Sequence, residues 1–524
     1  MHRFWRVSLL VCALLTAAPL FLSRHLPFSD LPEHVAVIAT LRHWWDPAWR
    51  SQELYTLSGP ATTPSLLYYV VGALLAVPFA NAETANLAML CAVAVGFPYA
   101  LRALLRSLHH DERLAVVACP LFWNRALAEG LLSYVASIPL VLWGIALAVR
   151  QARSPTRRRG VGLATLALVL FYLHVSGFVV FLGGACLVTV LVPLLRHPSS
   201  EDRLRPDLVG LARRLVWLGP VTVPAVALAL GGNGVRTDVI RFSPQIYLLR
   251  QLPGWLHDFW RSPGDDAAAA LLWLAFLALL LRRRRPADRR MDKARIAGAS
   301  LVALALALYF LLPSQVGFAF LLDVRNAPFI ALFAPLVLPA RNDLRARVGL
   351  VAMTVASAAL SVHAAWQMHA YERDEASDFD EILRNLPRGR KLLTLVFERR
   401  SRYVHVTPFV HFGGYYRIRY GGVASFSFAE LSHWPVRYRP EEAPPKKRVV
   451  FWDWNPCLYR NSHDGPYYDF VMARGAVDPF GGEPPGPKWR IIGGAGEWRL
   501  WQRVPGTWEP AVEAVDVGPC PAGG

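Results

Sequence analysis

The stretch "VSLLVCALLTAAPLFLSRHLPFSDLPEHVAV" (residues 7–37) joins an apolar run to a polar segment, and this combination decides the fold class. Residues 7–22 approach the ~20 apolar residues that a helix needs to cross the ~30 Å hydrocarbon core of a bilayer. Residues 23–27 make a poor signal-peptide cleavage site, so we expect an uncleaved anchor. Asp30, Glu33 and His34 then come close together where the chain has just left the membrane.

Apolar runs of this kind recur along much of the chain. The 524 residues are 54% hydrophobic and their mean hydropathy is positive, whereas a soluble protein would show shorter runs broken by polar faces. The further runs lie at residues 133–149, 160–173, 177–195, 267–281, 297–312 and 348–362. The sequence therefore predicts an α-helical multi-span membrane protein.

The net charge of +18 comes mainly from arginines that gather between the apolar runs. Such clusters are topology signals of the cytoplasmic side, so we expect membrane lipids as partners and no nucleic acid. Counting crossings between the clusters predicts about ten to twelve spans and an outer first loop at residues 23–63. Residues 64–101 hold two apolar segments that resemble spans. Residues 102–113 lie inside only if an odd number of these segments cross the membrane, so the topology of residues 64–101 stays open.

The composition changes near residue 366, where the chain becomes rich in Gly, Pro, Trp, Tyr and charge. We therefore expect two domains, a membrane domain at 1–365 and an extracytoplasmic α/β domain at 366–524. Outside the cytoplasm, Cys457 and Cys520 could form a disulfide. Segments rich in β-formers predict strands, and two of them meet at a Gly-rich turn and predict a hairpin at 488–504. The strand segments are residues 391–397, 448–454 and 468–473.

The aromatic segment "HVTPFVHFGGYYRIRYGGVASFSF" (residues 405–428) has two interpretations. Aromatic faces bind sugar rings well, which would make it a glycan-facing surface. A packed aromatic core with Gly turns explains the same composition, and we favour that interpretation.

Two interpretations also fit the polar group after the first span. Downstream of Pro32, helical spacing of apolar residues and Trp predicts a helix on the outer membrane surface. Asp30 would cap this helix and Glu33 would complete a capping box. In the functional interpretation, Asp30 is a general base that activates an acceptor hydroxyl. Glu33 or His34 then orients the acceptor or binds a divalent cation together with Asp30.

This layout resembles the GT-C superfamily of integral membrane glycosyltransferases, which use polyprenyl-phosphate sugars. The resemblance lies in the first-loop acid, the many spans and the C-terminal domain. The segment "FWNRALAEGLLSYVASIPLVLWGIAL" (residues 122–147) also resembles the mid-membrane segment of bacterial members. The resemblance implies that Asp30 is the catalytic acid. The first loop has no adjacent Asp-Asp, Asp-Glu or Asp-x-Asp pair, and Glu33 is the acid nearest to Asp30, so the use of a metal cofactor stays open.

Polar residues at the ends of spans are costly in a membrane and are functional candidates for that reason. His174 lies at one predicted outer turn, and Asp323 and Arg325 lie at another, in "FLLDVRNAP". Arg325 suits a lipid phosphate because guanidinium matches phosphate oxygens. An ion pair with Asp323, or a position at the membrane interface, also explains this arginine, and we favour that interpretation. If these turns and the turn at Asn124, Arg125 and Glu129 face one cavity, they converge on Asp30.

The sequence thus predicts a glycosyltransferase of a bacterial inner membrane. It would move a sugar from a polyprenyl-phosphate donor to an extracytoplasmic glycan, lipid or protein acceptor. The catalytic candidates are Asp30 and Glu33, and the substrate-binding candidates are His34, His174, Asp323 and Arg325. The alternative is a multi-span transporter or lipid flippase, which would carry polar residues at mid-bilayer depth and paired broken helices. A non-catalytic membrane scaffold is a third possibility.

Overall fold

The structure is a computed structural model that describes residues 2–506 apart from 61–62, 64, 196–207, 232–238, 282–288, 318, 339–342, 432, 446–453 and 481–485. Its contacts divide the chain into two units. The membrane unit consists of Met1–Leu22, Pro60–Tyr68 and Met89–Gln367, and the sheet unit consists of Ser23–Gly59, Tyr69–Ala88 and Met368–Gly524.

Within the described residues, six helices are long and apolar enough to cross a membrane, so the chain is an integral membrane protein. They are α1 (His2–Ala17, continued by η1, Ala18–Phe21), α5 (Ala82–Ser107), α7 (Leu132–Arg153), α9 (Val175–Leu194), α13 (Pro263–Leu280) and α16 (Leu344–Tyr371). Shorter apolar helical segments add to them at Leu67–Ala76, Arg295–Leu311 and Val324–Val337. The predicted total of about ten to twelve crossings stays a prediction.

The two apolar segments between residues 64 and 101 differ in length. The first forms α4 (Leu67–Ala76), whose 10 residues extend only about 15 Å as a helix. The second belongs to α5, with 26 residues. Only α5 is long enough to cross the ~30 Å of hydrocarbon. A single crossing in this stretch agrees with the odd number that is needed to place the basic residues 102–113 inside.

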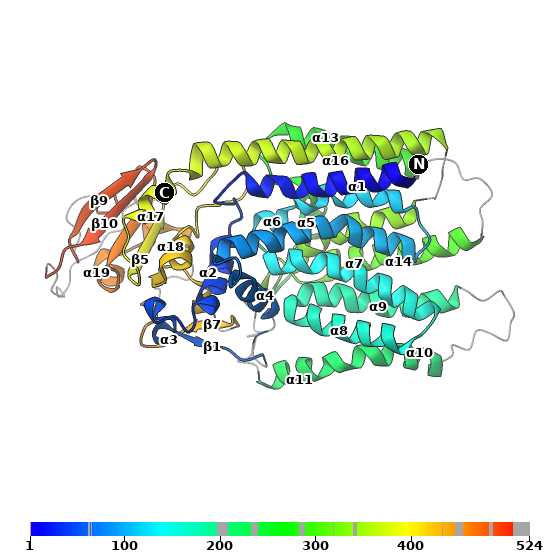
Figure 1. The fold of residues 1–524 in the computed structure, drawn as a ribbon, viewed down its shortest axis with the longest axis horizontal. Helices are drawn as coiled ribbons and strands as arrows, with labels where there is room; N and C mark the ends of the chain where they lie inside the picture. Colours follow the sequence, from blue (N-terminus) through cyan, green and yellow to red (C-terminus); the bar gives the residue numbers. More distant parts are fainter. Residues whose placement is uncertain are drawn as a thin grey trace. The chain divides into compact units, whose positions relative to one another are not determined.

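In the membrane unit, α7 packs against both α8 (Arg157–Leu173) and α9, and these helices run side by side in Figure 1. The close approach of α7 and α9 depends on Gly144. A Cβ atom at this position would lie 2.6 Å from Cε2 of Phe181, closer than two carbon atoms can approach. Helix α7 is the most buried of the six candidate spans, with 78% of its apolar window inside the protein, so it forms the core of this unit.

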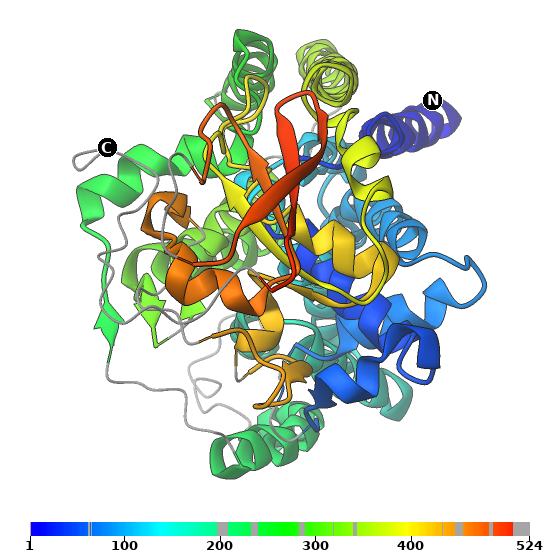
Figure 2. The ribbon, with the colours of Figure 1, turned by 90° about the vertical axis from the view of Figure 1, so that its left-hand side faces the viewer.

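The sheet unit contains a five-stranded sheet in the order β6-β5-β8-β10-β9, which faces the viewer in Figure 2. Strand β5 runs parallel to β6 and β8, while β8, β10 and β9 are antiparallel. The strands are β5 (Lys391–Val396), β6 (Val423–Ala424), β8 (Phe470–Arg474), β9 (Trp489–Ala495) and β10 (Trp498–Arg503). The predicted hairpin at 488–504 and the strands at 391–397 and 468–473 are present, whereas most of 448–454 lies outside the described residues.

The predicted first loop is built into the sheet unit. Helix α2 (Leu31–Arg42) packs along α18 (Gly413–Tyr420), and β1 (Tyr55–Leu57) pairs antiparallel with β7 (Val436–Tyr438). Residues Leu31–Thr40 of α2 are all buried, so the prediction of a helix lying on the membrane surface is wrong. By contacts, residues 23–59 and 69–88 group with the C-terminal part. The predicted division into domains 1–365 and 366–524 stays a prediction.

The packing of α2 on α18 requires a glycine at position 414. A Cβ atom there would lie 2.9 Å from the backbone carbonyl carbon of Pro32 and 2.8 Å from Oε1 of Glu33. The backbone of Pro32 cannot move aside unless the whole of α2 shifts.

We expect the substitution Gly414→Ala to lower the free energy of unfolding of the sheet unit by about 1–3 kcal/mol through overpacking. Thermal unfolding of the detergent-solubilised chain measures this change. Gly219 is the control, because it lies in a helical segment with no atom within 4 Å of its added Cβ. Equal stability of the two alanine variants would contradict the close packing of α2 on α18.

Candidate functional site

Asp30 immediately precedes α2, but its carboxylate makes no capping hydrogen bond. The predicted capping box is therefore wrong. Instead, Oδ1 of Asp30 lies 3.3 Å from Nε2 of His411. The Asp30 side chain is 28% exposed and the His411 side chain only 1%. This carboxylate thus has surface available for a substrate, with a buried imidazole behind it.

The His411 ring is held by aromatic neighbours. It stacks on Phe426 with ring centroids 4.1 Å apart, and the ring of Trp454 meets it edge-on at 5.6 Å. His411 belongs to the segment 405–428, for which the sequence favours a packed aromatic core, and it was not among the predicted site residues. Its contact with Asp30 joins positions that are hundreds of residues apart, and nothing in the local sequence indicates such a pairing.

Glu33 lies one helical turn after Asp30 in a very different environment. Its carboxylate has no exposed surface; it pairs with Nη1 of Arg417 at 2.8 Å and accepts the backbone N–H of Phe428 at 3.1 Å. Burial raises the pKa of the Glu33 carboxyl, and the Arg417 guanidinium and the Phe428 amide oppose this effect. Glu33 therefore joins α2 to α18 from the interior of the unit.

His34 is enclosed by aromatic residues. Its Nδ1 lies 2.8 Å from the hydroxyl of Tyr69, and its ring contacts Phe428 and Trp434 edge-on. Among the residues that the structure describes, no cluster of three His, Cys, Asp or Glu side chains is suited to hold a metal ion. The question of a divalent cation therefore stays open.

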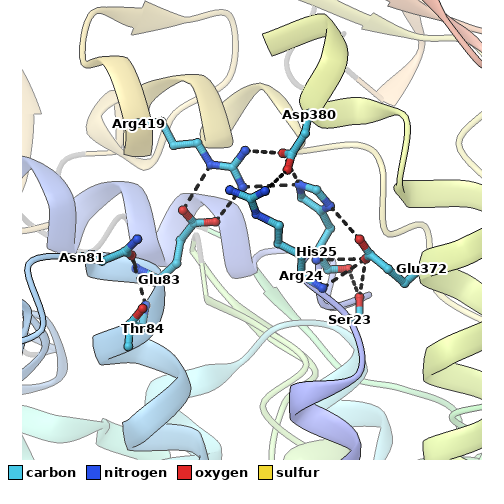
Figure 3. A network of polar contacts seen from close by, with 9 residues as sticks. All are labelled: Ser23, Arg24, His25, Asn81, Glu83, Thr84, Glu372, Asp380 and Arg419. Carbon is cyan, nitrogen blue, oxygen red and sulfur yellow. Dashed lines mark hydrogen bonds and ion pairs between the residues drawn. The ribbon is translucent and has the colours of Figure 1, made fainter. Parts of the chain in front are cut away.

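The chain segment that leads to Asp30 is anchored by Glu372, as Figure 3 shows. Oε2 of Glu372 accepts the Ser23 hydroxyl at 2.7 Å and the backbone N–H groups of Arg24 and His25 at 3.1 and 3.2 Å. One carboxylate thus satisfies the polar groups of this turn and fixes the direction in which the chain continues towards α2.

A second group of charges extends this anchor through the His25 side chain (Figure 3). Nε2 of His25 lies 3.0 Å from Oδ1 of Asp380, and Arg419 contacts both Asp380 and Glu83. Burial lowers the pKa of His25, but hydrogen bonds to Asp380 and Glu372 outweigh it and raise the pKa above the ordinary value of 6.5. Burial opposes the charge of Asp380, but His25 and Arg419 hold the pKa of this carboxyl well below its ordinary range.

The two pKa shifts limit the range of pH in which this cluster stabilises the fold. The contribution of protonated His25 is complete below pH 6.5 and is lost as the pH rises through the raised pKa. The contribution of ionised Asp380 is complete above its ordinary pKa of 3.8 and is lost as the pH falls through the lowered one.

We expect His25→Gln to lower the melting temperature most between about pH 4 and pH 6.5. The difference from the wild type should narrow towards alkaline pH, where both proteins lack the imidazolium charge. Thermal unfolding in detergent at a series of pH values measures this difference, with His463→Gln as the control at a histidine that is 42% exposed. A difference that does not change with pH would contradict the assigned charge on His25.

The membrane unit brings together two of the predicted substrate-binding residues. Nη1 of Arg325 lies 3.2 Å from Nε2 of His174, and Tyr134 donates its hydroxyl proton to the backbone carbonyl of Arg325. Nδ1 of His174 accepts the N–H of Ser176 at 3.1 Å and so caps α9. Because Nδ1 accepts a hydrogen bond, Nε2 of the neutral ring carries the proton, so Nε2 and the Arg325 guanidinium are both donors and together suit an anion such as a phosphate group.

The other polar residues of the predicted outer turns have local structural partners. Oδ1 of Asp323 accepts the N–H of Val324 at 2.8 Å, and Asp323 is buried. Asn124 caps the short helix α6 (Arg125–Ala128), and Arg125 pairs with Glu129 at 2.7 Å. The predicted convergence of these turns on Asp30 concerns both units and stays a prediction.

The sheet unit also has an aromatic hollow of about 940 Å³ along β9 and β10. Phe480, Trp489 and Trp501 line it, and Nε1 of Trp489 donates to Oδ1 of Asn461 at 2.8 Å. The same three rings pack against the hydrophobic core of the sheet. Because these three rings cover the core, their aromatic character is explained by packing and does not indicate a ligand.

Comparisons with known proteins identify the architecture. No protein-family model and no curated protein sequence matches the chain. The crystal structure of ArnT from Cupriavidus metallidurans in the apo state matches with a TM-score of 0.53 at 12% identity, over 97% of this chain and 100% of ArnT. The chain has the GT-C fold.

A second solved structure supports this fold. The arabinofuranosyltransferase AftD from mycobacteria matches with a TM-score of 0.50 at 14% identity and covers 96% of this chain. This chain spans only 40% of the length of AftD. At such low identities the likeness establishes the GT-C fold, as the sequence predicted, and the activity has to be argued from the residues.

Proposed function

We propose that the chain is a membrane glycosyltransferase that moves a sugar from a polyprenyl-phosphate donor to a glycan, lipid or protein acceptor. The observation that carries this proposal is that Asp30, in a chain with the GT-C fold, has a partly exposed carboxylate that does not cap its helix. Its carboxylate precedes α2, makes no capping bond and keeps 28% of its surface exposed. An acid that does not cap its helix and stays partly exposed, at the position where the family resemblance implies a catalytic acid, is best explained by a role in catalysis.

In this proposal Asp30 is the general base of an inverting transfer. One carboxylate oxygen takes the proton of the acceptor hydroxyl as the acceptor oxygen bonds to the anomeric carbon of the sugar. The bond from that carbon to the donor phosphate breaks at the same time, and the polyprenyl phosphate leaves with the electron pair. Glu33 and His34 do not contact the substrate in this mechanism, because both are buried and occupied by neighbouring residues.

Arg325 and His174 are the proposed ligands of the donor phosphate. Guanidinium binds phosphate oxygens in a bidentate way and keeps its charge at every relevant pH. Tyr134, which donates to the backbone carbonyl of Arg325, holds the backbone that carries this guanidinium. The Nε2–H of His174, 3.2 Å from Nη1, is a second donor for the same phosphate. Asp323 is assigned a supporting role, since its carboxylate is buried and caps the turn that carries Arg325.

The proposed location is a bacterial inner membrane with the sheet unit on the extracytoplasmic side. Cys457 is disulfide-bonded, which supports this side because disulfides persist in oxidising compartments. Its predicted partner, Cys520, lies outside the described residues. The free cysteines, in contrast, lie in apolar helices or beside them, at Cys12, Cys91, Cys119 and Cys186.

We expect Asp30→Asn to lower kcat by about 100- to 10,000-fold, the usual contribution of a general base, while the protein still folds. Transfer of radiolabelled sugar from polyprenyl-phosphate donors in isolated membranes measures this loss. An arabinofuranosyl donor is the first choice because AftD is named for that sugar. The matched control is Asp46→Asn, an acid of the same loop that is 40% exposed and contacts His43. Equal turnover by the wild type and Asp30→Asn would remove Asp30 from the mechanism and favour a transporter or flippase.

We expect Arg325→Ala to raise the KM for the lipid-linked donor by about 10- to 100-fold, because a charged hydrogen bond contributes about 1.5–3 kcal/mol. Arg325→Lys should restore only part of this affinity, since an ammonium group cannot bind phosphate in a bidentate way. Initial rates at several donor concentrations measure the KM, and Arg125→Ala is the control at another partly exposed arginine of the membrane unit. A donor KM that is unchanged in Arg325→Ala would contradict the assignment.

A further inference from the structure

We infer that His411 is a positioning residue that holds the carboxylate of Asp30 in its catalytic orientation. This inference rests on the proposed function of Asp30 and adds a residue from the far end of the chain to the same site. It starts from the 3.3 Å distance between Nε2 of His411 and Oδ1 of Asp30.

Packing alone does not explain a histidine at position 411. The ring lies between Phe426 and Trp454 and is almost completely buried. Its Nδ1 has no hydrogen-bond partner among the described residues. A buried polar atom without a partner is destabilising, so a phenylalanine would fill the same space at lower cost. The second nitrogen, which faces Asp30, is the feature that phenylalanine would lack.

The contact assigns different roles to the two oxygens of the Asp30 carboxylate. A carboxylate can only accept hydrogen bonds, so Nε2 of His411 carries the proton when the contact is favourable. Rotation about the terminal torsion of an aspartate is otherwise broad. Fixing Oδ1 removes this freedom and leaves Oδ2 to receive the proton of the acceptor hydroxyl.

The backbone keeps His411 in register with Asp30. His411 lies two residues before α18, and α18 packs along α2, which Asp30 precedes. Arg417 of α18 pairs with Glu33 of α2. His411 and Asp30 both act electrostatically on the Glu33 carboxyl, which is paired with Arg417.

The test compares three variants of full-length protein in membranes. We expect His411→Phe to lower kcat by about 100-fold, the effect of misplacing a catalytic group by about 1 Å, with an unchanged KM for the donor. His411→Gln keeps an N–H donor near the position of Nε2 and should recover most of the activity. The control is His43→Phe, because His43 makes a similar contact of 3.0 Å with Asp46 and stacks on Trp49.

A double variant separates positioning from a general structural effect. If His411 acts only through Asp30, Asp30→Asn with His411→Phe should be no slower than Asp30→Asn alone. Additive losses in the double variant, or an unchanged kcat in His411→Phe, would overturn the inference. Loss of transfer in Asp30→Asn with full activity in His411→Phe would overturn only this inference and leave the proposed function intact.

A measurement that needs no donor covers the case in which the wild type transfers no sugar. A water-soluble carbodiimide labels accessible carboxyl groups, and mass spectrometry reports the labelling rate of each one. We expect Asp30 to be labelled several-fold faster in His411→Phe than in the wild type or His43→Phe, because without the His411 contact the carboxylate rotates freely and exposes both oxygens to the reagent. An unchanged labelling rate would overturn the inference, and the melting temperatures of all variants show whether they are folded.

Discussion

The buried ion pair between Glu33 and Arg417 is the interaction on which the geometry of the site depends. The two side chains are 0% and 1% exposed, and the atoms in contact are 2.8 Å apart. Such a pair adds little net stability compared with well-packed apolar residues, but removing one partner costs about 3–5 kcal/mol because it leaves a buried charge. The main effect of the pair is therefore on the register of α2 against α18, because a shift of either helix would leave a buried charge without its partner. That register also sets the distance between Asp30 and His411.

The first loop is held in the sheet unit at several independent points. Glu372 anchors its start through Ser23, the β1–β7 pairing holds its end, and Gly414 allows α2 to approach α18 closely. Each of these contacts joins the N-terminal part of the chain to residues after 368. A segment held in this way loses little further entropy when a substrate binds, and preorganisation of this kind is what a general base requires.

The sequence predicted what depends on local pattern. Apolar runs identified the spans, and β-formers around a Gly-rich turn identified the hairpin at 488–504. The position after the first span led to Asp30 as the catalytic candidate, and this role stays a prediction. The prediction of an amphipathic surface helix for α2 is wrong, and "VAVIA" (residues 35–39), which is apolar on every face, indicates a buried helix. His411 and Arg417 could not be predicted, because their roles come from contacts with residues nearly 400 positions earlier, and no local pattern records such a contact.

The two acids at the start of α2 have the same functional group, but their different burial gives them different environments. Asp30 and Glu33 are one turn apart, and the sequence gives no reason to assign them different roles. Glu33 has the longer side chain, reaches the interior and is neutralised there by a permanent cation. Asp30 has the shorter side chain, stays at the surface and meets a histidine, which holds it without enclosing it. A proton acceptor has to be fixed in place and still reach its substrate, and only Asp30 meets both conditions, since the residues that fix it lie on its buried side.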